Sequence, residues 1–158
     1  MATTNKNLND FSAEITTDLK GKTFGIVVAE WNEEITKNLC SGAIVYLKGL
    51  GVWESNIIIK NVPGSFELTF AAQHFAKQKE VDAVICLGCV IKGETKHDEY
   101  ISNAVANGLT DVSLKFDKPV IFGLLTTNDK QQAIDRSGGK HGNKGTEAAM
   151  TAVRMLGL

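Results

Sequence analysis

The sequence predicts a single α/β domain in which helices cover both faces of a parallel sheet. Short β-branched segments alternate with longer segments of helical periodicity, the pattern typical of strand–helix–strand units. The chain has 158 residues, within the size of one domain, roughly 100 to 200 residues. No repeat, low-complexity segment or Pro/Gly/Ser-rich break divides it. We therefore expect one hydrophobic core system, in residues 21–158.

Composition and charge exclude several classes of protein. Seventeen basic residues against eighteen acidic ones give a formal net charge of -1, without the basic excess that a nucleic-acid-binding surface needs. Apolar runs such as residues 24–29 and 120–125 are far shorter than the roughly 18 residues that span a bilayer. The first thirty positions lack the pattern of a secretory signal. These features predict a cytoplasmic protein that binds neither nucleic acid nor membrane.

The first elements follow a polar N-terminal tail, residues 1–20. The tail carries a weak apolar alternation at Phe11, Ala13 and Ile15, which would suit an edge strand. Residues 23–29 form the first predicted strand. Asn32 is the predicted N-cap of a helix that ends at Gly49 and Gly51. Its apolar stripe is Ile35, Leu39, Ala43, Tyr46, Leu47 and Leu50.

The middle of the chain repeats this alternation. A second strand is predicted at residues 56–62, and a helix at residues 66–77 follows Pro63 and Gly64. A third strand covers residues 82–89 and leads into a polar loop that ends at His97.

The last third completes the sheet. Residues 98–116 have helical periodicity, and residues 119–125 form the fourth strand. Two further helices are predicted at residues 129–136 and 145–156, separated by a glycine-rich connection. The inward side chains of the 98–116 helix are Ile101, Val105, Leu109, Val112 and Phe116. The total is four parallel strands and about five helices.

The carboxyl ends of the strands are the predicted site, because open parallel sheets bind ligands there, where the direction of the connections reverses. These ends carry Trp31, the turn at residues 63–67, the loop at residues 92–97, and the segment that leads to Arg136. An aromatic ring, a carboxylate, an imidazole and a cation could therefore converge at one edge.

Each polar candidate also has a purely structural interpretation. His97 could exchange protons near neutral pH, or it could be a solvated residue at a helix start. Arg136 could bind a phosphate with its guanidinium, or complement a helix dipole. Gly93 and Thr95 suit an anion cradle at a helix N-terminus, although Glu94 opposes it.

The two candidate aromatic residues are equally ambiguous. Trp31 could stack on a planar heterocycle, or it could simply pack against other side chains, and the same holds for Phe122.

Two familiar motifs are rejected. Residues 138–146 are similar to a phosphate-binding loop, but Asn143 replaces the second required glycine and a helix precedes the segment. Cys86 and Cys89 have redox spacing, but the pair begins inside a predicted strand and not at a helix N-terminus. With Cys40, they are predicted to be buried structural thiols.

Several segments together resemble the 6,7-dimethyl-8-ribityllumazine synthase family. They occur in the family's order and cover about residues 20 to 157. They are PGSFE at residues 63–67, GCVIKGETKH at residues 88–97, FGLLTT at residues 122–127, Arg136, and GNKG at residues 142–145.

The resemblance implies the penultimate step of riboflavin biosynthesis. In this step 5-amino-6-(D-ribitylamino)uracil condenses with 3,4-dihydroxy-2-butanone 4-phosphate, releasing phosphate and water. It also implies a flavodoxin-like three-layer α/β/α sandwich with a central four-stranded parallel sheet. No metal and no organic cofactor is implied.

Site roles follow from the resemblance, residue by residue. His97 would transfer protons, Trp31 would stack on the pyrimidine, and Phe122 would close the pocket from a neighbouring subunit. The uracil and ribityl chain would contact Ser65, Phe66, Glu67, Cys89, Val90 and Ile91. The phosphate would contact Glu94, Thr95, Arg136 and Lys144. The chain departs from the family's pattern at Asp98, where relatives often have an aromatic residue, and at Trp31, where many have Phe.

The resemblance also implies self-association. A pocket shared between subunits requires a pentamer, and the short connection at residues 138–145 resembles that of relatives that build a 60-subunit icosahedral capsid. A functional association with riboflavin synthase is implied as well.

Two other functions compete with this one. A flavodoxin-like electron carrier would need Ser/Thr and Gly after the first strand, where Glu33 and Glu34 would instead repel phosphate. A catalytically silent shell protein would keep the assembly surface, but the intact set of polar site residues argues against it.

Overall fold

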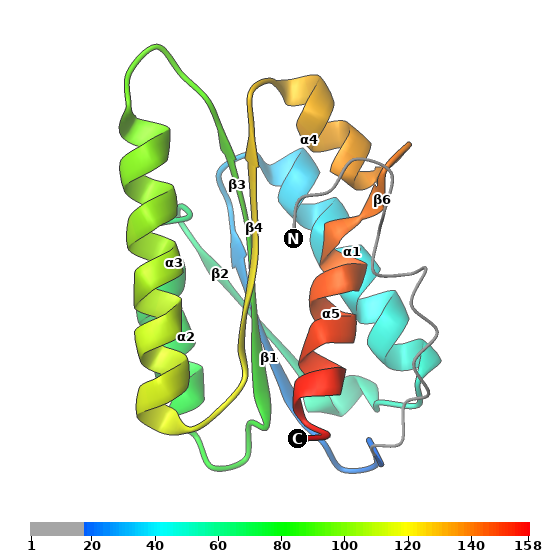
Figure 1. Cartoon of the computed structure of the whole chain (residues 1–158). Coiled ribbons are helices and arrows are strands. Elements are labelled where there is room, and N and C mark those ends of the chain that lie inside the picture. Colours follow the sequence, from blue (N-terminus) through cyan, green and yellow to red (C-terminus); the bar gives the residue numbers. More distant parts are fainter. Residues whose placement is uncertain (1–17) are drawn as a thin grey trace.

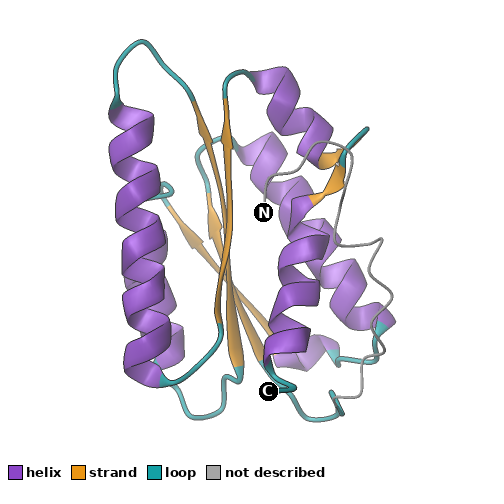
Figure 2. Cartoon of the chain, in the orientation of Figure 1, coloured by secondary structure: helices purple, strands orange, loops and turns teal. Residues whose placement is uncertain are grey.

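The computed structural model describes residues 18–158 as three layers. Helices α1, α4 and α5 cover one face of a central sheet and helices α2 and α3 cover the other, as Figure 1 shows with element labels and Figure 2 by type of element. The edge strand predicted around Phe11 to Ile15 lies outside the described residues. Within residues 18–158, no helix is both long and apolar enough to cross a membrane.

The sheet has the predicted four parallel strands. They are β1 (Phe24–Ala29), β2 (Ile57–Val62), β3 (Ala83–Ile91) and β4 (Val120–Thr127), in the order β2-β1-β3-β4. The chain moves from β1 outward to β2 and then returns to β3 on the other side of β1. The connections therefore reverse direction between β1 and β3, and open parallel sheets bind ligands at the carboxyl ends of the strands on either side of such a switch point.

Strand periodicity divides the core into two parts. Ile26 and Val28 of β1 pack on the α1/α5 side, whereas Val27 packs on the α2/α3 side. In β3, Ile85 belongs to the first cluster and Cys86 to the second. Successive side chains of a strand point to opposite faces, so a central strand needs an unbroken apolar sequence to serve both layers.

Five α-helices are present in the described chain, with bounds close to those predicted. They are α1 (Glu33–Gly49), α2 (Leu68–Ala76), α3 (His97–Phe116), α4 (Lys130–Arg136) and α5 (Lys144–Met155). The predicted apolar stripes are confirmed: Ile35, Leu39, Ala43 and Leu47 of α1, and Val105, Leu109 and Val112 of α3, are buried. The flanking Tyr46, Leu50, Ile101 and Phe116 pack on the cores while half-buried.

The connection before α5 differs from the prediction. Residues 137–143 contain a small antiparallel hairpin, β5 (Ser137–Gly139) and β6 (Gly142–Asn143). Gly138 and Gly142 adopt positive φ angles of 124° and 74° in it. Glycine-rich segments of this length carry no strand periodicity, so the sequence predicted only a connection. A short 3₁₀ helix, η2 (Glu54–Asn56), also precedes β2.

Candidate functional site

Backbone hydrogen bonds join the carboxyl end of β1 to the end of β2 and the turn that follows it. The Glu30 N–H donates to the Val62 carbonyl at 2.8 Å, and the Trp31 N–H donates to the Pro63 carbonyl at 3.2 Å. The β1 end and the turn after β2 are thereby held together. The Trp31 side chain is 72% exposed beside them, which leaves its ring free to stack on a ligand.

Asn32 acts differently from the prediction. It occupies the N-cap position of α1, but its side chain makes no capping bond. Its backbone is left-handed, with φ 60° and ψ 46°, a conformation that asparagine tolerates better than most residues. Its amide instead donates to the Cys89 carbonyl at 2.9 Å. This bond ties the residues after β1 to the end of the neighbouring strand β3.

Ser65 lies against the β3 backbone. It is only 6% exposed, and a Cβ at Gly88 would stand 2.8 Å from its Oγ. Glycine at position 88 therefore leaves the room that the PGSFE turn needs to approach β3. The next two side chains of the turn, Phe66 and Glu67, are exposed. They can contact a ligand above the sheet edge.

Cys89 is part of the apolar floor of the site. It is 1% exposed, and burial raises the pKa of its thiol to about 11, so the thiol is neutral at physiological pH. Val90 and Ile91 follow and are half-buried. All three cysteines are free and buried, as predicted. Cys86 packs in the α2/α3 cluster and Cys89 in the opposite one, which excludes a disulfide between them.

The loop after β3 leads directly into α3. The Lys92 N–H donates to the Thr127 carbonyl at 2.8 Å, so the pairing of β3 with β4 continues to the loop. Glu94 and Thr95 are exposed, and His97 is the exposed first residue of α3. The N–H groups of a first helical turn lack backbone partners and attract anions. The His97 imidazole is therefore exposed at the N-terminus of α3, next to Glu94 and Thr95 in the chain.

Two cations follow β4, in different environments. Arg136 ends α4 and is half-buried; its guanidinium has one long bond, from Nη1 to the Gln132 carbonyl at 3.5 Å. Lys144 begins α5, and its Nζ lies 2.7 and 2.8 Å from the two carboxylate oxygens of Glu147, which is 7% exposed. Arg136 has no carboxylate partner among residues 18–158, so no ion pair offsets its charge.

Phe122 does not reach this edge within its own chain. It pairs with Cys86 in the middle of β4, whereas the strand end is at Thr127. It lies three positions before Leu125, the partner of Cys89, a spacing that corresponds to about 10 Å along a strand. Its ring is 44% exposed on the edge strand. The fold therefore keeps Phe122 away from the carboxyl ends of the strands.

Comparison with known proteins identifies the family of this chain. The family model for 6,7-dimethyl-8-ribityllumazine synthase matches residues 21–158. The chain belongs to this family.

Curated relatives with this name are similar over nearly the whole chain. The protein from Cytophaga hutchinsonii is 60% identical over 156 residues, which are 99% of this chain and 98% of the relative. The protein from Parabacteroides distasonis is 51% identical over the same shares of the two chains. The protein from Porphyromonas gingivalis is 52% identical and covers 100% of this chain and 98% of its own.

The lumazine synthase fold therefore brings together the ends of β1, β2, β3 and β4, with Trp31 and His97 exposed around them. Sequence reasoning missed Asn32 as a bridge between the residues after β1 and the end of β3, and it missed Glu147 as the partner of Lys144. The three-residue spacing of Lys144 and Glu147 on a helix was the available signal for the second. Within residues 18–158, no cluster of His, Cys, Asp and Glu could hold a metal ion.

Proposed function

We propose that this chain condenses 5-amino-6-(D-ribitylamino)uracil with 3,4-dihydroxy-2-butanone 4-phosphate at the edge formed by the carboxyl ends of β1 to β4. As a member of its family, it is an enzyme that forms 6,7-dimethyl-8-ribityllumazine in the penultimate step of riboflavin biosynthesis. The observation that carries the location is the bond from Asn32 to the Cys89 carbonyl at the switch point of the sheet.

The pyrimidine and ribityl chain bind at the carboxyl ends of β1 and β3. The exposed Trp31 ring stacks on the pyrimidine, and the end of β3, at Cys89, Val90 and Ile91, offers backbone groups to its polar edge. Ser65, Phe66 and Glu67 line the other side, because the Trp31–Pro63 backbone bond holds that turn against the β1 end. Stacking and backbone hydrogen bonds together suit a planar, polar heterocycle.

The phosphate of the second substrate contacts the residues before α3 together with two cations beside α4 and α5, which cover the other face of the sheet. Thr95 and the backbone at Glu94 donate to it, the Arg136 guanidinium supplies the main charge, and Lys144 contributes less because Glu147 already neutralises it. The exposed Glu94 carboxylate points away from the anion in this arrangement. His97, adjacent to this subsite in the chain, transfers protons during dehydration, phosphate elimination and ring closure.

Most of the acceleration comes from holding the two substrates in register, since an amine and a ketone condense in water without a catalyst. We therefore expect His97 to improve turnover and not to be indispensable. No cofactor takes part in this proposal.

A complete site requires a second subunit. Phe122 lies too far from the strand end to close the pocket of its own chain, so a neighbour supplies it. Large exposed apolar side chains on the α2/α3 side could be covered by that contact: Phe66, Phe70, Tyr100 and Leu114. We propose a pentamer, with further assembly to a 60-subunit icosahedral capsid. A functional association with riboflavin synthase and a cytoplasmic location complete the proposal.

Tryptophan fluorescence tests the pyrimidine subsite, because the chain has only two tryptophans, Trp31 and Trp53. Titration with 5-amino-6-(D-ribitylamino)uracil should quench the wild type and the Trp53→Phe variant, but not the Trp31→Phe variant, which should still bind by calorimetry. Trp53 is also exposed, at 64%, and lies at the start of η2, so it is a matched control. Equal quenching in both variants would refute the stacking assignment.

A further inference from the structure

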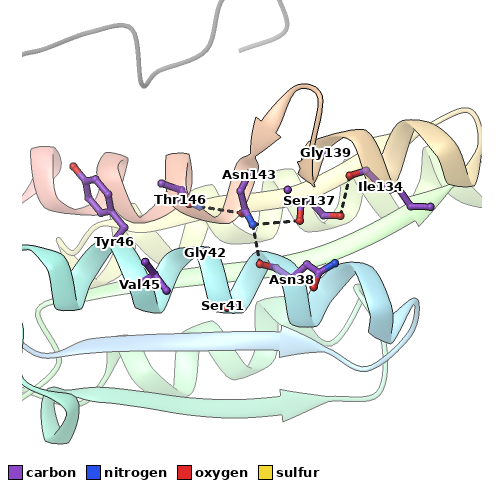
Figure 3. A pocket seen from close by; sticks show the side chains of 11 residues that line it. Asn38, Ser41, Gly42, Val45, Tyr46, Ile134, Ser137, Gly139, Asn143 and Thr146 are labelled. Atoms are coloured by element: carbon purple, nitrogen blue, oxygen red, sulfur yellow. Dashed lines mark hydrogen bonds between the residues drawn. The ribbon is translucent and has the colours of Figure 1, made fainter.

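Asn143 is the most highly connected side chain near the candidate phosphate subsite. Its Nδ2 donates to the Asn38 carbonyl at 2.8 Å and to the Ser137 carbonyl at 3.3 Å. Its Oδ1 accepts from the Gly145 and Thr146 N–H groups at 2.8 and 3.3 Å. One amide therefore joins α1, the β5 strand and the first turn of α5, as the dashed lines in Figure 3 show.

The surrounding chain is shaped to hold this amide. A Cβ at Gly42 would lie 2.5 Å from the Asn143 Cγ, so only glycine leaves room for the side chain against α1. Gly145 is similarly pressed onto the Leu39 backbone. Asn143 forms one wall of an open groove of about 580 Å³. The amide is thus fixed from the α1 side, by packing as well as by hydrogen bonds.

The two residues that Asn143 fixes directly adjoin the candidate phosphate ligands. Ser137 follows Arg136 in the chain, and Lys144 lies between Asn143 and Gly145. The Arg136 side chain itself has only a long bond to its own helix. Its position therefore depends on where the end of α4 is anchored, and Asn143 anchors that end through the Ser137 carbonyl.

We propose that Asn143 is a positioning residue that holds Arg136 and Lys144 in register for the phosphate of the butanone substrate. This inference rests on the proposed function and adds a residue to it. Asn143 does not touch substrate. It acts by setting the separation of two cations carried by different helices, and misplacement of a binding group by about 1 Å already weakens binding strongly.

Asn143→Asp and Asn143→Ser test the proposal, since both keep an N-cap acceptor for α5 and lose the amide donors to Ser137 and Asn38. We expect the KM for the butanone phosphate and the inhibition constant of inorganic phosphate to rise together, roughly five- to tenfold. The KM for the uracil and kcat should stay within about twofold. Asn38→Ala is the matched control, because its backbone carbonyl remains and its exposed side chain is not used.

The outcomes separate this inference from the proposed function. Unchanged phosphate constants in both Asn143 variants, with raised constants in Arg136→Ala, would overturn the positioning role and leave the phosphate subsite standing. Unchanged constants in Arg136→Ala as well would overturn the subsite itself. If the KM values of both substrates rise equally and kcat falls as well, Asn143 is only a structural residue. If neither Asn143 variant folds, Gly42→Ala displaces the same amide from the α1 side and should give the same selective loss.

Discussion

Arg136 and Lys144 show at the scale of single residues how neighbours decide what a charge can do. Both are half-buried cations close to the hairpin β5–β6. Lys144 is neutralised by the buried Glu147 carboxylate, whereas Arg136 meets only a backbone carbonyl in the described chain. A guanidinium in this state can form a bidentate pair with phosphate.

Replacement of Arg136 should weaken the phosphate substrate selectively. Arg136→Ala is expected to raise the KM for the butanone phosphate about tenfold to a hundredfold, since a hydrogen bond to a charged group contributes roughly 1.5 to 3 kcal/mol. The KM for the uracil should change little. Lys130→Ala is the control. Lys130 is a cation of the same helix, and it forms an exposed ion pair with Glu34. Steady-state kinetics with each substrate varied in turn measure both constants. An unchanged KM for the butanone phosphate in Arg136→Ala would show that Arg136 does not bind the phosphate.

Residue types predicted the site better than residue contacts. Trp31, His97 and Arg136 could be proposed because an aromatic ring, an imidazole and a guanidinium follow strand ends, a loop and a predicted helix. The bridging amides of Asn32 and Asn143 could not, because both looked like ordinary caps or turn residues in the sequence. Each has a backbone carbonyl partner far away in the chain, Cys89 for Asn32 and Asn38 for Asn143, which no local pattern encodes.

Close packing of α1 on α5 dominates at the scale of elements. Gly145 in the first turn of α5 faces the Leu39 carbonyl of α1 so closely that no side chain fits. Gly49 in the last turn of α1 has nothing near it. Of these two helical glycines, therefore, only Gly145 is required by packing.

Substitution by alanine should distinguish these two glycines. Gly145→Ala forces two backbones apart and is expected to cost about 2 to 3 kcal/mol in the free energy of unfolding. Gly49→Ala should be neutral or stabilise by up to about 1 kcal/mol, because alanine favours the helix. Urea unfolding of both variants makes the comparison, and equal effects would show that the α1–α5 contact is looser than described.

The hairpin β5–β6 should respond to acid. Hydrogen bonds from Lys140 and Gln131 lower the pKa of the Asp135 carboxyl below its usual range. A carboxyl group whose pKa is lower in the folded than in the unfolded protein stabilises the fold. This contribution is complete at pH values above the pKa in the unfolded chain, about 3.9, and it is lost as the pH falls through the pKa in the folded protein.

Asp135→Asn measures this contribution. The variant should be less stable than the wild type at pH 6, and the difference should shrink as the pH falls below about 4. Lys140→Ala should reduce the same pH dependence by removing the ion pair, whose atoms lie 2.9 Å apart. The free energy of unfolding is measured in urea across this pH range. A constant difference between the wild type and Asp135→Asn would contradict a role for the ion pair.

Periodicity predicted the elements almost completely, and pairing explains where it fell short. Strand β3 extends to Ile91 and β4 to Thr127, two residues beyond the predicted ends, because those residues pair in register. Polar residues such as Thr126 hide a strand end from hydropathy, although pairing with a neighbour stabilises it. The hairpin at residues 137–143 was missed for the same reason: tertiary contacts to α1 decide its conformation.

At the scale of the whole molecule, we propose shared sites because of the position of Phe122. It lies in the middle of edge strand β4, while the other candidate residues surround the carboxyl ends of the strands. The proposed pentamer resolves this separation by pairing one subunit's His97 with a neighbour's Phe122.

Mixed assemblies test the sharing directly. His97→Ala and Phe122→Ala should each be impaired alone, yet subunits refolded together at equal amounts should have about a quarter of their sites intact. Activity above that of either parent supports shared sites. A mixture no more active than the average of the two parents would place each site within one chain. His74→Ala, which alters an exposed histidine of α2, replaces His97→Ala in the control mixture.

The most direct measurement is the formation of 6,7-dimethyl-8-ribityllumazine by purified protein. The two substrates are mixed with and without the chain, and product is followed by absorbance and fluorescence against the slow uncatalysed reaction. The wild type should accelerate product formation; His97→Ala should be slower but remain above the uncatalysed rate, and Arg136→Ala should need more butanone phosphate. Folded, assembled protein that gives no acceleration would contradict the account and favour a shell protein without catalytic activity.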